Sequence, residues 1–315
     1  MSRGRCLARG VGLWALWRLL GPRVPPAFPA GQERPAGPPG RTLTAGGHEF
    51  LVREAGPEEA PRVLLLHGWA FDSLAAWHRV IPLLEGRRRV VAPDLRAHGK
   101  SDRTRGRFSV EDLADDMAAV LDALGPGRYT VVGYSLGGAV AQALARRHPA
   151  RVERLVLAAT GAQPVRGPRA AAVLLLVAQR ALARLGFLVV PRVMHRYLLS
   201  TGAVPPQHAA WLWETLVGRD PDLHYEAGFA LARFDSRAWL GEVSMPVLCV
   251  IPARDQLIPP LRQQATAALI PGAAVVEIPE ARHEALFTHA GDLAAAILGF
   301  TAGVEPGGVA MVGGE

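Results

Sequence analysis

Lysine and cysteine are scarce in this 315-residue sequence. The first shortage decides which residues carry the positive charge, and the second bears on disulfides and metal sites. Lys100 is the only lysine, so nearly all of the positive charge is arginine. The two cysteines, Cys6 and Cys249, are far apart, one in a basic stretch and one in an apolar run. They therefore predict neither a disulfide framework nor a metal site, and we expect a buried thiol at Cys249.

Motifs for common cofactors are missing as well. The sequence has no G-x-G-x-x-G, C-x-x-C or H-E-x-x-H motif. Glu111, Asp112, Asp115 and Asp116 resemble a carboxylate cluster for a metal, but they occupy the first turns of a predicted helix, where the helix dipole favours negative charge. We interpret them as a solvated helix face and predict no metal and no cofactor.

The formal charge of +7 is concentrated at one end of the chain. Residues 1–42 hold seven arginines and one glutamate, which account for six of the seven charges. The rest of the chain is close to neutral, so we do not expect a nucleic-acid surface. Half of the residues are apolar, which excludes a disordered or low-complexity protein.

The N-terminal apolar stretch is too short to cross a membrane. Val11–Leu20 is interrupted by Arg18 and has about half the length of a membrane span. Three interpretations of residues 1–42 stay open: a disordered, proline-rich extension, a helix on a membrane surface through residues 1–20, or a poor secretory signal without a small-residue cleavage pattern. Residues 301–315 are glycine-rich and predict a disordered tail.

Beyond residue 42, short apolar runs alternate with amphipathic helical patterns. His48–Arg53 has the pattern of a half-exposed antiparallel strand. Val110–Leu124 has the pattern of a helix, with Ser109 as its N-cap and Gly125 just beyond its end. The alternation predicts an α/β fold, with a mostly parallel central sheet and helices on both faces. Six runs are typical of strands buried on both faces: Arg62–Leu66, Arg89–Ala92, Tyr129–Val132, Leu155–Ala158, Val247–Ile251 and Ala274–Ile278.

The alternation is interrupted once, between Gly161 and Glu242. This stretch has no convincing strand and contains apolar helical segments at Ala170–Val190, His195–Leu199 and Gln207–Val217. We predict a helical lid, inserted late in the sheet over the strands' C-terminal edge, where ligands bind in open α/β sheets. The predicted organisation is an extension at 1–42, a core at 43–160 and 243–300, a lid at 161–242 and a tail at 301–315.

The strongest chemical signal is the G-x-S-x-G pattern at residues 133–137. It stands between the predicted strand at Tyr129–Val132 and a predicted helix at Leu136–His148, the context in which such a serine is lifted above the sheet on a strained turn. Gly133 and Gly137 are expected because strand and helix approach too closely there for side chains. Ser135 is therefore the candidate nucleophile.

A serine nucleophile needs a base and an orienting carboxylate. His283 follows the last predicted strand, in a loop that can face the serine, and His289 is the weaker candidate. Asp255 follows the preceding strand in the same way, and Asp235 is the fallback. The chain order of serine, aspartate and histidine is the order expected for a serine on such a strand–turn–helix.

From about Thr42 to Phe300, the sequence resembles α/β-hydrolase-fold proteins of the serine-hydrolase type. The resemblance rests on His67-Gly68-Trp69, on residues 94–101, on the serine turn and on the two loops above; the arginine-rich composition is similar to that of actinobacterial members. It implies Ser135 as nucleophile, His283 as base and Asp255 as acid. It also implies an oxyanion hole made of the backbone N–H groups of Trp69 and Leu136.

Two positions depart from the family pattern. Ala97 and Ala253 stand where glycine is usual, so each is expected to strain a turn without removing a reacting group. His67 is expected to be structural. Trp211 and Trp213 are candidates for an acyl pocket under the lid, although a plain lid core explains them equally well.

The leading prediction is a cofactor-independent serine hydrolase that cleaves a carboxylic ester or thioester through an acyl-enzyme. The alternatives are a C–C hydrolase, perhydrolase or acyltransferase with the same triad, or a non-catalytic ligand-binding homologue, because fold and triad do not fix the substrate. We expect a small-molecule acyl substrate and no nucleic acid. A cytoplasmic location is expected, with peripheral membrane association through the N-terminal extension as the alternative.

Overall fold

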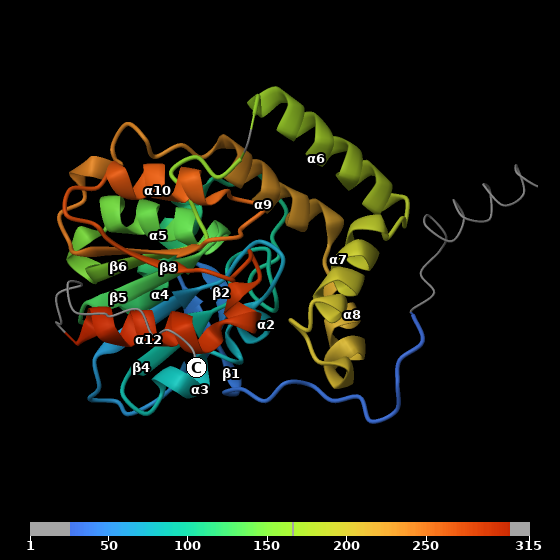
Figure 1. Cartoon of the computed structure of the whole chain (residues 1–315), viewed down its shortest axis with the longest axis horizontal. Helices are drawn as coiled ribbons and strands as arrows, with labels where there is room; N and C mark the ends of the chain where they lie inside the picture. The colour runs from blue at the N-terminus through green and yellow to red at the C-terminus, as the bar shows by residue number, and fades with distance from the viewer. Residues whose placement is uncertain (1–25, 166, 303–315) are drawn as a thin grey trace, which may run out of the picture.

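The computed structural model describes residues 26–165 and 167–302, which form a single eight-stranded sheet with helices around it (Figure 1). The strand order is β1-β2-β4-β3-β5-β6-β7-β8; β1 pairs antiparallel with β2, β2 pairs antiparallel with β4, and all later pairs are parallel. The prediction of an α/β fold with a mostly parallel sheet is confirmed. The strands are β1 Gly40–Ala45, β2 His48–Ala55, β3 Arg62–Leu66, β4 Arg89–Pro93, β5 Tyr129–Tyr134, β6 Val152–Ala158, β7 Val247–Pro252 and β8 Ala274–Ile278.

Strand β1 was missed by the sequence reasoning. Its register pairs Gly40 with Arg53 and Ala45 with His48, and the turn between the strands is Gly46-Gly47, both with positive φ. The strand is mostly exposed, so it lacks the apolar run that marked the others. The expected start of the core at residue 43 therefore falls inside β1.

Helices cover both faces of the sheet because its central strands are apolar on both sides. One face packs against α4 (Val110–Ala123) and α5 (Leu136–Arg147), where Leu64 and Val131 meet the helix side chains. The other face packs against α2 (Ser73–Trp77), α3 (Ile81–Leu84) and α12 (Ala290–Thr301). Figure 1 shows α5 and α12 on opposite sides of the strands.

The predicted helix near residue 110 begins and ends as its sequence indicates. Ser109 and Asp112 form a reciprocal capping box, in which the Ser109 hydroxyl accepts from the Asp112 N–H and the Asp112 carboxylate accepts from the Ser109 N–H. Gly125 follows the helix with φ of 101°. The prediction of a buried thiol is also confirmed, since Cys249 lies buried in β7, and this burial raises the pKa of the thiol to about 12.

Between β6 and β7 the chain forms a run of helices, which we call the helical insertion (residues 159–246). The expectation of one helical segment over Ala170–Val190 is wrong. Helix α6 ends at Arg184 and the chain bends at Leu185-Gly186, where Gly186 has φ of 86°. Figure 1 shows α6 standing away from the sheet, with only its neighbours in the insertion against it. The helices are α6 Arg169–Arg184, α7 Val189–Ser200, α8 Ala209–Val217 and α9 Pro221–Arg233; α10 (Pro260–Ala268) and α11 (Ala285–Thr288) belong to the chain after β7.

The described part of the N-terminal extension lies against the insertion. The Gln32 side chain donates to the Pro206 carbonyl and accepts from the Ala210 N–H, and the Glu33 N–H donates to Gln207. In Figure 1 this segment runs from below α8 to β1. Cys6, Val11–Leu20, the proposed membrane contact of residues 1–20 and the tail from residue 303 onward lie outside the described residues.

Within residues 26–165 and 167–302, no single helix is long and apolar enough to cross a membrane. Helices α6 and α7 together have the length and apolar composition of a membrane span, but they are bent by 98° at the break between them.

Candidate active site

Ser135 occupies the sharp turn between β5 and α5. Its backbone has φ of 54° and ψ of −114°, a conformation that a side-chain-bearing residue rarely adopts, and it is the N-cap residue of α5. Its N–H donates to the Ala158 carbonyl at 3.0 Å, and its own carbonyl accepts from the Thr160 hydroxyl at 2.8 Å. These two bonds to the end of β6 hold the strained turn in place.

The glycines that flank the serine are required by close backbone approach. A Cβ on Gly137 would overlap the carbonyl oxygen of Leu66 at the end of β3. A Cβ on Gly133 would overlap the Gly137 carbonyl. The expectation that strand and helix come too close for side chains at both positions is confirmed.

The structure brings Ser135, His283 and Asp255 together from three loops. His283 Nε2 lies 3.1 Å from Ser135 Oγ, and His283 Nδ1 lies 2.8 Å from Asp255 Oδ2. With the ring proton on Nδ1, His283 donates to the aspartate and accepts from the serine hydroxyl. This arrangement can take the serine proton as the oxygen attacks a carbonyl carbon.

The Asp255 carboxylate is almost fully buried and held by four hydrogen bonds. Besides His283, it accepts from the Leu257 N–H at 2.8 Å, the Ile258 N–H at 2.9 Å and Gln263 Nε2 at 3.0 Å. These donors fix which oxygen faces the histidine. Gln263 was not singled out from the sequence; its place eight residues after the acid, on the first turn of α10, was the available signal.

Tyr134 is a second residue that the sequence reasoning missed. Its hydroxyl donates to the His283 carbonyl at 2.6 Å, and its ring packs edge-on against the His283 ring. Burial raises the pKa of this phenol, so that it remains a donor. Tyr134 occupies the variable position before the serine, which is why the motif itself does not indicate its role.

Two backbone N–H groups beside the serine are available as donors. Among the described residues, neither the Trp69 N–H nor the Leu136 N–H makes a hydrogen bond. Leu136 is the first residue of α5, where N–H groups point outward at the positive end of the helix. A Cβ on Gly68 would lie 3.4 Å from the Ser135 Cβ, so the turn with Trp69 packs directly on the serine.

Two buried histidines fix the turn that carries Trp69. His67 Nδ1 donates to the Gly68 carbonyl and Nε2 accepts from the Leu95 N–H, which fits a neutral ring whose pKa is lowered by burial. His98 Nε2 lies 3.0 Å from the Trp69 carbonyl, and burial lowers the pKa of His98 to about 3. The expectation that His67 is structural agrees with these contacts.

The fallback residues lie elsewhere. The Asp235 carboxylate pairs with Arg169 and Arg237, and His289 makes its side-chain contact with the Thr288 hydroxyl. Neither belongs to the Ser135 group. Of the two departures from the family pattern, Ala97 has φ of 66° and is strained as expected, whereas Ala253 is not among the described residues with positive φ.

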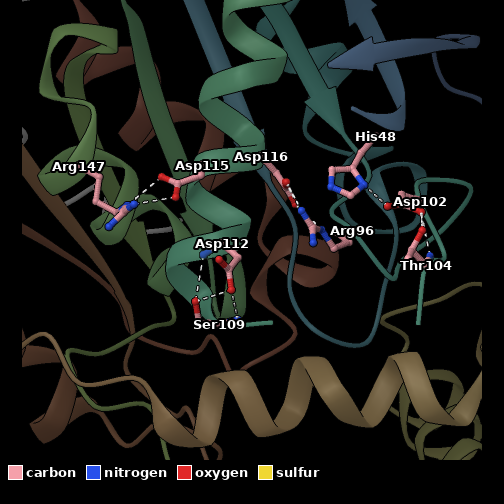
Figure 2. Close-up of polar contacts among 9 residues, drawn as sticks. All are labelled: His48, Arg96, Asp102, Thr104, Ser109, Asp112, Asp115, Asp116 and Arg147. Atoms are coloured by element: carbon pink, nitrogen blue, oxygen red, sulfur yellow. Dashed lines mark hydrogen bonds and ion pairs between the residues drawn. The ribbon is translucent and has the colours of Figure 1, made fainter. Parts of the chain in front are cut away.

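The four acidic residues of α4 do not form a common site. Asp112 caps its own helix, Asp115 pairs with Arg147, and the buried Asp116 pairs with Arg96 (Figure 2). Asp115 also pairs with His148. The interpretation as a solvated helix face is therefore wrong for Asp116. No group of three or more potential metal ligands occurs in the part of the chain that the structure describes.

The insertion contains a cavity of about 460 Å³ between α6, α8, α9 and the bend before α7. Trp213 lines it, whereas Trp211 packs against His78 outside it. His224, another lining residue, stacks on the Trp69 indole with ring centroids 4.7 Å apart. The Trp69–His224 stack therefore connects the serine turn with the wall of the cavity.

This chain is similar in sequence and in structure to known proteins. The model of the alpha/beta hydrolase fold family matches residues 61–202. Pimeloyl-[acyl-carrier protein] methyl ester esterase of Nitrosomonas europaea is 32% identical over 235 residues, which cover 71% of this chain and 88% of that enzyme. A solved hydrolase from Pseudomonas aeruginosa PA01 is 28% identical, with a TM-score of 0.73, over 83% of this chain and 98% of that chain.

These similarities show that the chain belongs to the α/β-hydrolase family. An uncharacterized protein of Mycobacterium tuberculosis is 41% identical over 118 residues, 38% of this chain. The match spans 34% of the length of that relative.

Proposed function

We propose that the protein is a serine hydrolase that cleaves a carboxylic ester through an acyl-enzyme intermediate. The observation that carries the proposal is the unbroken chain of hydrogen bonds from Ser135 Oγ through His283 to the buried Asp255 carboxylate. The similarity to a methyl ester esterase over most of that enzyme's length supports an ester as substrate.

In the first half-reaction, Ser135 Oγ attacks the carbonyl carbon of the ester while His283 Nε2 takes the hydroxyl proton. The carbonyl oxygen becomes negative next to the Trp69 and Leu136 N–H groups, the proposed oxyanion hole. The bond between the acyl carbon and the ester oxygen then breaks. The His283 imidazolium donates its proton to that oxygen, and an alcohol departs. Asp255 holds the ring orientation and stabilises its positive charge.

In the second half-reaction, water repeats the sequence on the acyl-serine ester. His283 takes a proton from the water, the oxygen adds to the acyl carbon, and the serine leaves with the proton back on Oγ. The net reaction consumes one water and yields a carboxylic acid and an alcohol. None of these steps requires a group beyond the residues named.

The first test is covalent labelling with a fluorophosphonate, followed by intact mass. We expect one adduct on the wild type and none on Ser135→Ala or His283→Ala, with circular dichroism to verify that all three are folded. Ser200→Ala, an exposed serine of the insertion, is the matched control and keeps the adduct. A folded wild type that takes no label would contradict the proposal and favour a ligand-binding homologue.

Ester hydrolysis is then distinguished from the alternative reactions by assays with different compounds. We expect p-nitrophenyl esters to be hydrolysed, with loss of at least about 10³ in kcat for Ser135→Ala. A thioester of the same acyl group, a vinylogous diketone and an added alcohol acceptor test thioesterase, C–C hydrolase and acyltransferase activity in turn. Faster turnover of the diketone than of the ester would assign the triad to C–C cleavage.

A further inference from the structure

Helix α6 leaves one face to solvent, and that face is apolar. Its other face, with Val173, Leu176 and Ala183, packs against Tyr225 and Phe229 of α9. Apart from the terminal arginines, the outward residues are only alanine, leucine and valine, which reverses the usual amphipathic pattern. The exposed residues of α6 are Arg169, Ala170, Ala171, Leu174, Leu175, Val177, Ala178, Ala181, Leu182 and Arg184.

This exposure is concentrated in one place. Of the eleven large hydrophobic residues that are exposed in the described part of the chain, six lie between residues 174 and 193. Leu174 is 70% exposed and Leu185, at the bend before α7, is 73% exposed. Four of the six lie on α6 itself, one at the bend and one on α7, and such a concentration of exposed apolar residues in one segment marks an interaction surface. We call the six residues the α6 patch: Leu174, Leu175, Val177, Leu182, Leu185 and Val193.

Arginines outnumber carboxylates around the patch. Residues 167–213 contain five arginines and no aspartate or glutamate, although the chain as a whole has 28 acidic residues. The carboxylates beside α6 come from other segments and are paired with arginines; Glu226, for example, pairs with Arg233. Asp222 pairs with Arg180, Arg184 and Arg105, and Asp235 pairs with Arg169 and Arg237.

An apolar face bordered by arginines matches the surface of an anionic bilayer. The leucines insert between the lipid chains while the arginines remain at the level of the negative head groups. A second copy of the chain fits less well, because pairing the patch with itself would bring arginine-rich edges together. We propose that α6 and the bend to α7 dock on the surface of an anionic lipid bilayer.

The patch also adjoins the cavity of the insertion. Leu182 belongs to the patch and lines the cavity together with Gln179 and Ala183. If the ester hydrolase function holds, on which this step rests, a docked protein has the α6 wall of its apolar cavity beside the lipid. An acyl ester dissolved in the bilayer would then reach the cavity without crossing water.

The binding test uses the full chain and sedimentation with vesicles. One set of vesicles is phosphatidylcholine, and the other also contains phosphatidylglycerol. We expect the wild type to bind the anionic vesicles, and the double variant Leu174→Gln/Leu185→Gln to bind them at least about tenfold more weakly. The control is Leu83→Gln/Leu261→Gln, two leucines that are 47% and 78% exposed on other helices and should change binding less than about twofold.

Each alternative to an anionic bilayer at the α6 patch predicts a different experimental result. Equal binding of wild type and α6 variant would overturn the proposal, and loss of binding only in Trp14→Ser/Trp17→Ser would assign it to the N-terminal stretch. Equal binding to neutral and anionic vesicles would remove the role of charge. A dimer in sedimentation velocity that the α6 variant dissociates, without vesicle binding, would assign the patch to a second copy.

Activity assays separate this proposal from the proposed function. A short ester in solution should be hydrolysed equally by wild type and α6 variant, whereas a long-chain ester in anionic vesicles should be hydrolysed at least about fivefold more slowly by the variant, following its weaker binding. Vesicle binding without any hydrolysis would contradict the ester hydrolase and leave the docking proposal standing. If the α6 variant no longer hydrolyses the soluble ester, the two substitutions have damaged the fold. The inference that Leu174 and Leu185 act in membrane docking would then be overturned.

Discussion

The α/β core and helix α6 of the helical insertion bury their residues to very different extents. All six residues of β5 are buried, whereas Leu176 is the only buried residue of the sixteen in α6. The core is fixed by apolar packing on both faces of a sheet. Helices α8 and α9 of the insertion share in this packing, since Leu212 and Ala227 belong to the two core clusters. The Trp69–His224 stack and the hydrogen bond from the Tyr197 hydroxyl to Glu284 add further contacts, so α6 is the part of the insertion that stands apart.

This difference separates two tasks. The proposed reacting groups come from loops at the ends of core strands, where a fraction of an ångström matters and the surrounding structure holds them. Helix α6 supplies one wall of the cavity and an outward face, and an element with few buried residues opens at lower free energy than a core does. We therefore expect the chemistry on the well-packed core and substrate access at the more loosely packed α6.

The largest expected effect concerns two aspartates, one in each region. Asp255→Asn should lower kcat by about 10³–10⁴, or about 4–5 kcal/mol of barrier, because the amide favours the wrong ring proton on His283. Asp235→Asn, at the edge of the insertion, should leave kcat within about twofold because it loses only exposed ion pairs. Steady-state kinetics on an ester check both, and equal losses would contradict the assignment of Asp255.

The next effect compares two glycines. Gly137→Ala should lower the free energy of unfolding by about 3 kcal/mol or more, because the new Cβ overlaps the Leu66 carbonyl. Gly186→Ala at the bend of the insertion, with open space around it and φ of 86°, should lose about 1 kcal/mol from backbone strain alone. Urea unfolding measures both, and a Gly137 variant as stable as the Gly186 variant would refute close packing at the turn.

The junction between the two regions should be sensitive to acid. Burial holds the pKa of His98 at about 3, whereas an unfolded histidine takes up a proton near pH 6.5. The unfolded state then binds more protons below pH 6.5, so the free energy of unfolding falls as pH falls, by about 2 kcal/mol between pH 7 and 5 for such a group. Urea unfolding of His98→Asn should show a free energy of unfolding that depends less steeply on pH. An unchanged pH dependence would exclude His98 as its source.

The smallest effect compares two tyrosine hydroxyls. Tyr134→Phe leaves the His283 carbonyl without its donor and should cost about 1–2 kcal/mol of stability, with a fall in kcat as the histidine loop loosens. Tyr197→Phe removes the partly exposed bond to Glu284 and should cost less than about 1 kcal/mol. Hydrogen exchange should then rise in the insertion for Tyr197→Phe and in the His283 loop for Tyr134→Phe. The reverse pattern would contradict the division into two regions.

The sequence predicted the core strands well because a strand buried on both faces needs a continuous apolar run. Arg62–Leu66 was located to the residue for this reason. Ala274–Ile278 was also located to the residue, but the prediction that it is buried on both faces is wrong, because β8 is the edge strand and Val275 is 45% exposed. Strand β1 has no such run, and its pairing with β2 depends on the Gly46-Gly47 turn. In the insertion, helical periodicity was visible, but the bend at Gly186 was not, since glycine within a helical pattern is compatible with both a break and a continuous helix.

The candidate site divides in a similar way. Ser135, Asp255 and His283 could be proposed because each follows a predicted strand, and the C-terminal ends of parallel strands meet at one edge of a sheet. Tyr134 and Gln263 could not, because their roles depend on which oxygen or carbonyl a side chain meets in space. The same limit applies to Asp116, whose partner Arg96 lies twenty residues away in a separate loop.

The sequence by itself determined the fold class, the strand–turn–helix around Ser135 and the order of the three candidate residues, because these depend on local patterns and on the topology of a parallel sheet. Only the tertiary structure decided which face of α6 is left uncovered, which tryptophan borders the cavity and which buried donors hold the Asp255 carboxylate. Those features arise from contacts between residues far apart in the chain, and no local pattern specifies such contacts.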